Sequence, residues 1–455
     1  MLRDSNYTRL RLPAYACLLA LTCATSMAQE NAPVSDSRVP AGRDQLFDLS
    51  LSAGMAFTDN IGRQPADEDS GTIGLAGIQL AYAQKSLRLE SDIDVNATYE
   101  SYSDDAFDDD VIGGADAMLR FGIVPDRLTW LVLENFGQVS ADPFAADTPE
   151  NREDINYFTT GPNLLLNLGN DFSLDLAARY SNVQYESQPA DGDQLGGSAS
   201  FARQLSTISA IALIFDHTKF EFDDETFNPG YSRQQVFVNY KAEGRRTELS
   251  ADLGYTSLDM EDGSSPDGAL ARFSISRRMS GAASLSASVG TQFSDSGEMF
   301  RQGQSQGSVV TDVSSVVGAS DPFRSDFASL AFGYDRNRTE MGIDVSLEKE
   351  RYENSTVLDR DLMTWSAHVL RHISPTLEVS LFARGTGQDF QTVDYDSDDL
   401  DVGGFVRWVV GRTLSLRLQY NHFDRDSSNA AIDFSENRAS LRIYWSPVGA
   451  RGASR

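Results

Sequence analysis

The sequence predicts an all-β protein, a transmembrane antiparallel up-and-down β-barrel of about 20 strands, within a range of about 18 to 22. Three observations predict it. Hydrophobic and polar residues alternate along most of the chain. The alternating segments are mostly about 11 to 15 residues long, whereas strands of soluble proteins usually have about five or six. The connections between them are short and long in turn.

The alternation is clearest in LRLESDIDVNATY at 87–99, where the even positions are all polar and most odd positions are hydrophobic. Because successive side chains of a strand point to opposite faces, this pattern gives one apolar and one polar face. The same pattern recurs at 285–293, 413–421 and 438–446. No segment of the mature chain has a convincing helical period, so we expect strands throughout.

The connections differ systematically in length and charge. After even-numbered strands they are tight turns, such as PDR at 125–127 and GR at 411–412, and after odd-numbered strands they are longer and acidic, such as 59–70 and 140–153. Outer-membrane barrels combine short periplasmic turns with long outer loops. The pattern therefore predicts a barrel in the cell outer membrane, with its acidic loops outside.

The N-terminal residues predict export. Basic residues precede the apolar run AYACLLALTCAT at 14–25, and SMA at 26–28 supplies small residues before a cleavage site. We expect a signal peptide at 1–28, a periplasmic linker at 29–45, the barrel at 46–447 and a C-terminal tail at 448–455. Both cysteines lie in the signal peptide, which excludes disulfides, thiolate metal sites and cysteine nucleophiles from the mature chain.

Charge and hydropathy limit the classes of partner and of membrane protein that fit this chain. The formal net charge of −29 argues against a nucleic-acid partner, because phosphate binding needs clustered Lys and Arg. No stretch of about 18 apolar residues follows Ala28, which excludes a helical membrane protein. We expect the partners of the barrel to be outer-membrane lipid and lipopolysaccharide.

The polar face of each strand predicts the lining of a water-filled lumen, and the apolar face predicts contact with lipid. Aromatic residues near strand ends suit the girdles at the membrane interface: Tyr99, Trp130, Tyr180, Tyr255, Trp365, Trp408 and Trp445. By parity, the candidate lumen-facing residues are Arg88, Asp92, Asp94, Arg179, Arg272, Arg384, Arg407, Arg417, Arg438 and Arg442.

We find no catalytic, cofactor-binding or metal-binding motif and expect no enzyme. His368 and His372 would lie about 13 Å apart on one face of a strand. The acidic stretch SYSDDAFDDDVIGG at 101–114 lacks the ligand spacing of a calcium loop, so we interpret it as a solvated loop. Weak divalent bridging to lipopolysaccharide phosphates is the alternative. Gly161 and Pro162 fall inside the sixth strand and predict a bulge or a shifted strand start.

The segment LSLSAGMAFTDNIGR at 49–63, with TDN at 58–60, resembles the first strand of a family of outer-membrane β-barrel proteins associated with bacterial exopolysaccharide and PEP-CTERM systems. TGP at 160–162 is also similar to that family. The resemblance implies a Gram-negative outer membrane, a role in polysaccharide export or assembly, and partners that include polysaccharide and periplasmic export components. It implies no catalytic residues.

Three functions remain open at this point. The leading one is a pore or conduit associated with exopolysaccharide export or assembly. The second is a general or substrate-specific uptake porin. The third is a non-conducting structural or adhesive barrel that presents its loops.

Overall fold

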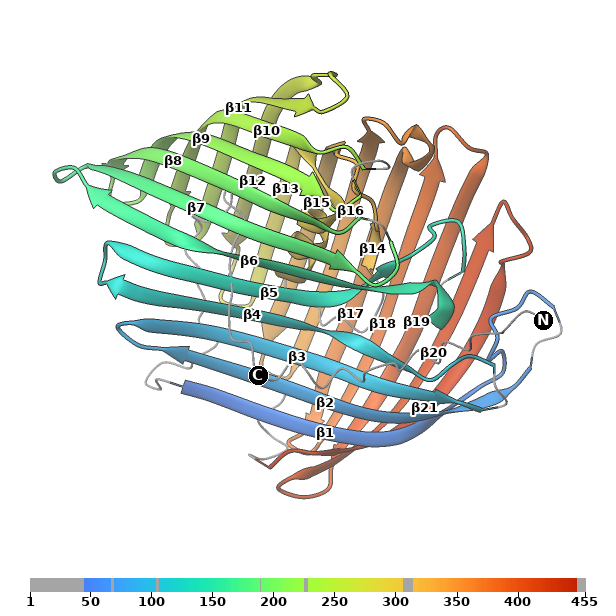
Figure 1. Ribbon diagram of the computed structural model, residues 1–455. Helices are drawn as coiled ribbons and strands as arrows, with labels where there is room; N and C mark the ends of the chain where they lie inside the picture. The colour runs from blue at the N-terminus through green and yellow to red at the C-terminus, as the bar shows by residue number, and fades with distance from the viewer. Residues whose placement is uncertain are drawn as a thin grey trace, which may run out of the picture.

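The computed structural model of the chain shows a closed, antiparallel, up-and-down barrel (Figure 1). The structure describes residues 45–447, except 67–68, 104–105, 147, 189, 225–227 and 306–313. The predicted signal peptide, the linker up to residue 44 and the C-terminal tail lie outside the described residues, as do Asp104 and Asp105 of the acidic stretch.

Within this part of the chain, 20 strands form the barrel wall and each pairs with its neighbours in chain order. Their bounds are β1 Gln45–Thr58, β2 Gly71–Lys85, β3 Leu89–Tyr102, β4 Asp110–Val124, β5 Leu128–Ser140, β6 Arg152–Asn167, β7 Phe172–Tyr185, β8 Gly192–Ser206, β9 Ser209–Phe222, β10 Tyr231–Glu243, β11 Thr247–Met260, β12 Asp267–Arg278, β13 Ala283–Ser294, β15 Phe323–Arg336, β16 Thr339–Tyr352, β17 Arg360–Ser374, β18 Leu377–Phe390, β19 Tyr395–Val409, β20 Leu414–Ser427 and β21 Phe434–Trp445.

The barrel closes where the first strand meets the last. Strand β1 pairs with β2 along its whole length, and with β21 from Leu51, opposite Trp445, to Thr58, opposite Arg438. A closed sheet has no free edge, so every backbone polar group of the wall can find its partner within the wall. The predicted fold class and strand number are therefore confirmed.

The two ends of the barrel differ as predicted. Turns such as 125–127, 207–208 and 337–338 join strands at one end, and longer connections such as 59–70 and 141–151 join them at the other. The alternation in length is not strict, because the connection at 391–394 between β18 and β19 is as short as the turns at the opposite end. By the rule for exported barrels, the short turns mark the periplasmic end.

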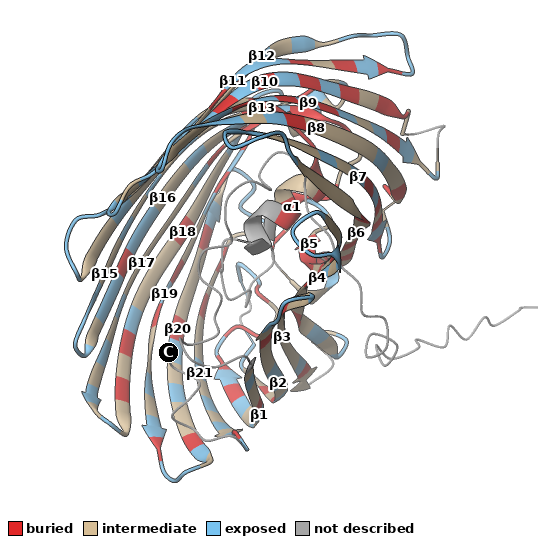
Figure 2. Cartoon of the chain, turned by 90° about the vertical axis from the view of Figure 1, so that its left-hand side faces the viewer, coloured by how far each residue is buried: buried red, intermediate tan, exposed pale blue. Residues whose placement is uncertain are grey.

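The outer surface of the barrel is apolar. Leu213 on β9 and Leu253 on β11 have exposed fractions of 53% and 66%, and on a distant part of the wall Leu381 on β18 and Leu418 on β20 have 65% and 58%. Exposed residues alternate with less exposed ones along the strands (Figure 2). Water would penalise an apolar band of this extent, and lipid would not. No helix among the described residues is long and apolar enough to cross a membrane.

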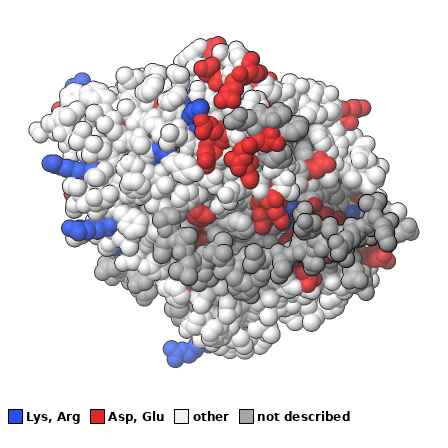
Figure 3. All heavy atoms as spheres, viewed as in Figure 1, with Lys and Arg blue, Asp and Glu red and all other residues white. Residues whose placement is uncertain are grey.

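The predicted girdle aromatics all lie on the outward parity of their strands, and six of them are well exposed: Tyr99, Trp130, Tyr180, Tyr255, Trp408 and Trp445. Charge is distributed unevenly between the two ends. On the face shown in Figure 3, Lys and Arg project toward the left and bottom, where the short turns lie, and Asp and Glu gather toward the top and right, where the long connections lie.

The connection between β13 and β15 contradicts the expectation that the mature chain holds no helix. It forms helix α1 (Ser296–Ser305) and the short strand β14 (Ser314–Val317). Figure 2 shows α1 inside the barrel. Strand β14 pairs in parallel with the end of β5, with Ser314 opposite Val139 and Val317 opposite Ser140. The longest connection of the protein therefore folds into the lumen and reaches the opposite wall.

Strand β6 runs straight through Gly161 and Pro162, so neither the predicted bulge nor the shifted strand start occurs. The register with β7 is the same on both sides, and the ladder skips only these two residues. Nη1 of Arg179 donates hydrogen bonds to the carbonyl oxygens of Pro162 and Ala178, both at 2.9 Å. A side chain thus supplies the donor that a proline lacks, which keeps the strand in register.

Candidate functional site

The contacts of α1 show which face of the wall is the lumen face. Arg233 on β10 pairs with Glu298 of α1, and the ring of Tyr157 on β6 lies 5.2 Å from the guanidinium carbon of Arg301 of α1. Opposite residues of an antiparallel pair share a face, so the inward parity can be followed from strand to strand around the barrel. Followed around all 20 wall strands, the assignment returns to the same inward face of β6.

The structure places most of the predicted lumen residues on this inward parity: Asp92, Asp94, Arg179, Arg272, Arg384, Arg407, Arg417, Arg438 and Arg442. Arg88 is the exception. It lies exposed in the turn between β2 and β3, so its expected strand position is wrong. The parity of 87–99 is correct, but the strand begins only at Leu89.

Several lumen arginines form ion pairs with carboxylates on a neighbouring strand. The Nε atoms of Arg272 and Arg384 lie 2.9 Å from Asp252 and 2.8 Å from Asp401, respectively. Others are Arg360 with Glu350 and Arg425 with Asp399, whereas Arg438 pairs with Glu436 of its own strand, two positions away. The lumen wall is therefore a lattice of opposite charges, which sequence parity alone could not pair because the register was unknown.

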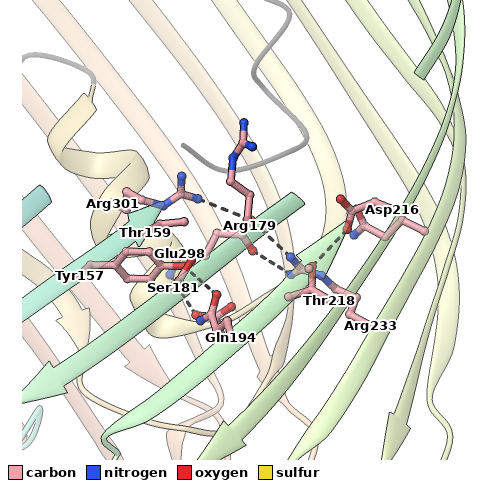
Figure 4. A pocket seen from close by; sticks show the side chains of 13 residues that line it. Tyr157, Thr159, Arg179, Ser181, Gln194, Asp216, Thr218, Arg233, Glu298 and Arg301 are labelled. Atoms are coloured by element: carbon pink, nitrogen blue, oxygen red, sulfur yellow. Dashed lines mark hydrogen bonds and ion pairs between the residues drawn. The ribbon is translucent and has the colours of Figure 1, made fainter. Parts of the chain in front are cut away.

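Helix α1 is held against the wall by what we call the docking cluster: Tyr157, Asp216, Arg233, Asp295, Glu298 and Arg301. Nη1 of Arg233 lies 2.8 Å from Oε2 of Glu298, and both side chains are about nine-tenths buried. The same atom donates a hydrogen bond to the carbonyl oxygen of Phe293 at 3.2 Å. Figure 4 shows α1 at the upper left, beside Arg301, with Asp216 and Arg233 to the right on their β-strands.

The start of α1 carries its own cap. Oδ1 of Asp295 accepts a hydrogen bond from the backbone N–H of Glu298 at 3.0 Å, and the carbonyl oxygen of Asp295 accepts one from the N–H of Met299. An acidic N-cap followed three residues later by Glu is a helix-start signal. The residues DSGE at 295–298 are therefore a local start signal for this helix, although the segment has no clear helical period.

The two acidic residues of the docking cluster titrate in opposite directions. Burial and the neighbouring Glu298 raise the pKa of Asp295 to about 6. Burial alone would also raise the pKa of Glu298, but the charges of Arg233 and Arg301 and the hydrogen bond from Arg233 outweigh it and lower that pKa. At neutral pH both carboxylates are mainly ionised, with Asp295 much closer to protonation.

A polar cavity opens between α1 and strands β6 to β10. It amounts to about 490 Å³, including the part open to solvent, and the docking cluster lines it together with Thr159, Arg179 and Gln194 among others. Several buried atoms of its lining have no protein partner: Oγ1 of Thr159, Oδ2 of Asp216 and Asp295, and Nε of Arg233 and Arg301. Buried polar atoms need hydrogen bonds, so this space suits water or a polar solute.

Of the residues around this cavity, only Arg179 is among the lumen-facing residues that the sequence predicts. Arg233 lies on the more polar parity of its strand, so the parity argument could have included it. Asp216 shares its face with the apolar Ile214 and Phe220, so parity could not have identified it. Residues 295–301 could not be placed in the lumen by parity, because they belong to a connection. Among the described residues, no group of three or more His, Cys, Asp or Glu could hold a metal ion.

No protein-family model matches the chain, and a search of curated proteins finds no relative. Solved structures similar to it include the FrpB iron transporter from Neisseria meningitidis, with 10% identity over 90% of this chain and 82% of that one, at a TM-score of 0.47. A mutant of the ferric enterobactin receptor PfeA from Pseudomonas aeruginosa has 9% identity over 88% and 80% of the two chains, at 0.47.

OpdQ from Pseudomonas aeruginosa has 11% identity over 89% of this chain and 100% of that one, at a TM-score of 0.37. These values are too low to carry an argument about function, so the class of the protein rests on its own barrel. A closed antiparallel wall, an apolar exterior and a charged interior are the properties of barrels that span the outer membrane. The chain is a β-barrel of the outer membrane.

Proposed function

We propose that this protein is a passive, selective pore for small hydrophilic solutes, narrowed by helix α1. The observation that carries the proposal is a helix held inside a wide, charged barrel by the Arg233–Glu298 ion pair. Barrels of about eight strands fill their interior with side chains, whereas barrels of about 16 to 18 strands leave an aqueous channel. A 20-stranded wall belongs to the wide class.

The segments that fold into the lumen support a restricted passage. In the part of the chain that the structure describes, α1 and β14 enter the barrel and supply 14 residues of regular structure (ten in α1 and four in β14). The connection between β5 and β6 reaches across the lumen as well, since the ring of Phe144 packs against Phe390 of β18 and Tyr395 of β19. Helix α1 and β14 narrow the lumen on the side of β5 to β10, where the docking cluster lies. On the other side, the arginine-rich wall toward the short-turn ends of β18 to β21 lines the passage.

An exopolysaccharide conduit is the second candidate, and it stays a prediction. It rests on the resemblance of segment 49–63, and the polar lumen wall suits the hydroxyl groups of sugars. We place it second because a helix across the lumen favours small solutes over a polymer. Polysaccharide and periplasmic export components remain predicted partners of that candidate alone.

Current through single channels tests the pore. Mature protein, refolded and inserted into planar bilayers, should give discrete conductance steps. Replacing 296–305 with a Gly-Ser segment of equal length should increase the step size, because the narrowing helix is lost. The same replacement in the exposed connection 261–266 serves as a control and should leave the steps unchanged. Correctly folded protein that gives no steps would be a non-conducting barrel.

Solute size distinguishes the two transport functions. In liposome swelling, a selective pore should pass monosaccharides quickly and longer oligosaccharides slowly, and the Gly-Ser replacement of α1 should raise that size limit. Equal rates for all lengths, or passage of polymer by the unaltered protein, would favour the conduit.

A further inference from the structure

Three arginines stand side by side on the lumen wall near the short-turn end. Arg407 of β19 is the direct cross-strand partner of Arg417 of β20, and Arg417 is the direct partner of Arg442 of β21. We call these three residues the arginine row. They come from strands whose short-turn ends lie within a few residues, so the row is close to the periplasmic mouth.

The row concentrates charge that its surroundings do not balance. Like charges on directly opposite residues destabilise a sheet. Glu378 of β18 pairs with Arg407, with Nη1 and Oε1 3.5 Å apart. The described residues give neither Arg417 nor Arg442 an ion pair, and Nε of Arg417 is buried without a protein partner.

This arrangement differs from the rest of the lumen. Arg272, Arg384 and Arg425 each face a carboxylate on an adjacent strand within 3 Å. The chain carries a net charge of −29, so carboxylates are abundant, yet the described residues give the row a carboxylate partner at Arg407, which pairs with Glu378, and none at Arg417 or Arg442. An unbalanced cationic row in an acidic protein costs stability, and an external anion would balance it.

One member of the row is also fixed in place. The guanidinium carbon of Arg417 lies 3.8 Å from the centre of the Phe405 ring, on the neighbouring strand. Stacking on an aromatic face orients the planar guanidinium. Tyr444 of β21 hydrogen-bonds to part of its edge, and Nε is left available for a further hydrogen bond. An ordered guanidinium between two others offers several parallel N–H groups to a planar or tetrahedral oxyanion.

We propose that the arginine row binds the carboxylate or phosphate group of an anionic solute as it passes through the pore. The inference rests on the proposed pore function, to which it adds the charge class of the solute. Guanidinium pairs recognise both groups with bidentate geometry, so the chemistry shared by carboxylate and phosphate is what the row selects. An acidic sugar and an inorganic phosphate are the two sources to be compared.

Calorimetric titration of the detergent-solubilised mature protein tests binding without requiring current. D-glucuronate and D-glucose share a sugar ring and differ in the carboxylate, and inorganic phosphate supplies the other oxyanion. We expect glucuronate or phosphate to bind and glucose not to bind. Arg417→Gln should weaken binding at least tenfold. Arg417→Lys should weaken it less, because lysine keeps the positive charge and loses only the bidentate geometry of the guanidinium.

Arg412→Gln is the matched control, because it removes the same charge from the exposed turn between β19 and β20, outside the row. It should bind like the unaltered protein. Heat-modifiable gel mobility verifies that each variant is folded. Binding of glucose as tight as that of glucuronate, or unchanged binding in folded Arg417→Gln, overturns the proposal. Glucuronate binding alone assigns the site to carboxylates, and phosphate binding alone assigns it to phosphate.

Reversal potentials in a salt gradient separate this inference from the pore itself. Arg417→Gln should shift the selectivity of the channel toward cations, and Arg412→Gln should not. If the protein gives no current but binds glucuronate through Arg417, the proposed pore function is refuted and the proposed anion site stands. If the protein binds neither anion, and Arg417→Gln and Arg412→Gln conduct with the same selectivity, the pore function stands and the proposed anion site is refuted.

Discussion

Nη1 of Arg233 on β10 lies 2.8 Å from Oε2 of Glu298 on α1, and this ion pair ties the wall of the barrel to the helix inside it. The two residues are 65 positions apart in the chain, so the contact fixes a long connection by one of its ends. Both side chains are almost completely buried, so removing either partner alone would leave the charge of the other buried and unpaired.

Glu298→Gln should release α1 from the wall. Removing one partner of a buried ion pair leaves an uncompensated charge, here that of Arg233, and costs about 3 to 5 kcal/mol. Added protease should then cleave within 296–305 much faster than in the unaltered protein. The double variant Arg233→Gln with Glu298→Gln should lose less than Glu298→Gln alone. If the loss in the double variant equals the sum of the losses in Arg233→Gln and Glu298→Gln, the two residues act independently.

Docking of α1 should depend on pH. The pKa of Asp295 is raised to about 6 in the docked state, so protons favour docking and α1 is held more tightly as the pH falls from 7 toward 5. The lowered pKa of Glu298 acts oppositely, because its stabilisation is lost only when that carboxylate becomes protonated at more acidic pH. Docking should therefore be tightest between the ordinary range of a Glu carboxyl, near 4.5, and about 6.

Hydrogen exchange of the α1 amides at several pH values, corrected for intrinsic rates, measures this dependence. Asp295→Asn should remove the change between pH 5 and pH 7, since the side chain can no longer titrate. Asp262, an exposed residue of another long connection, offers the control Asp262→Asn, which should leave the exchange of α1 unaltered. A profile that is the same with and without Asp295 would contradict the assignment.

Neighbouring positions on β16 should respond oppositely to an introduced charge. Leu347 has an exposed fraction of 50% on the lipid side, and Ser346 faces the lumen. Leu347→Arg should lower the free energy of unfolding in bilayers by about 2 to 4 kcal/mol, the range for Arg near the midplane of a barrel. Ser346→Arg should cost much less, because water solvates it. Urea titrations in lipid vesicles compare the two, and equal losses would refute the assigned faces.

Gly161→Ala should destabilise the wall between β6 and β7. A Cβ atom at this position would lie 1.9 Å from the carbonyl oxygen of Ala178, so the strands would have to separate. We expect a loss of about 1 to 3 kcal/mol, as for other forced overpacking. Gly197→Ala on β8 is the control, since its Cβ would meet Ala177 at an ordinary 3.7 Å. Equal unfolding midpoints for the two variants would show that the wall yields there without strain.

The barrel itself could be predicted because lipid and water impose the same alternation on every strand. That constraint set the fold class, the number of strands and the inward parity of residues such as Arg384 and Arg417. Strand bounds are less constrained, and Arg88 therefore lies one residue before the strand to which parity assigned it. Pro162 was expected to disturb its strand, but the side chain of Arg179, which the register brings alongside, compensates for it.

What the sequence could not predict depends on register and on contacts between distant segments. Helix α1 is short and is stabilised by Arg233 on the wall, so its own periodicity is too weak to identify it. The adjacency of Arg407, Arg417 and Arg442 follows from the pairing of three strands, and no spacing within one segment contains it. Both features of the candidate site are therefore products of tertiary structure.

The closure between β1 and β21 has a consequence for how fast the protein folds. Ser446 donates a hydrogen bond to Ser50 across 396 positions of chain, whereas the other wall strands pair with neighbours in sequence. Hairpins of adjacent strands can form early, because their loops are short. Joining the ends carries the largest loop-closure entropy of any contact in the wall and must wait for the final strand. The junction of first and last strands should therefore limit the folding rate, and an excess of either terminal strand as a free peptide should slow refolding.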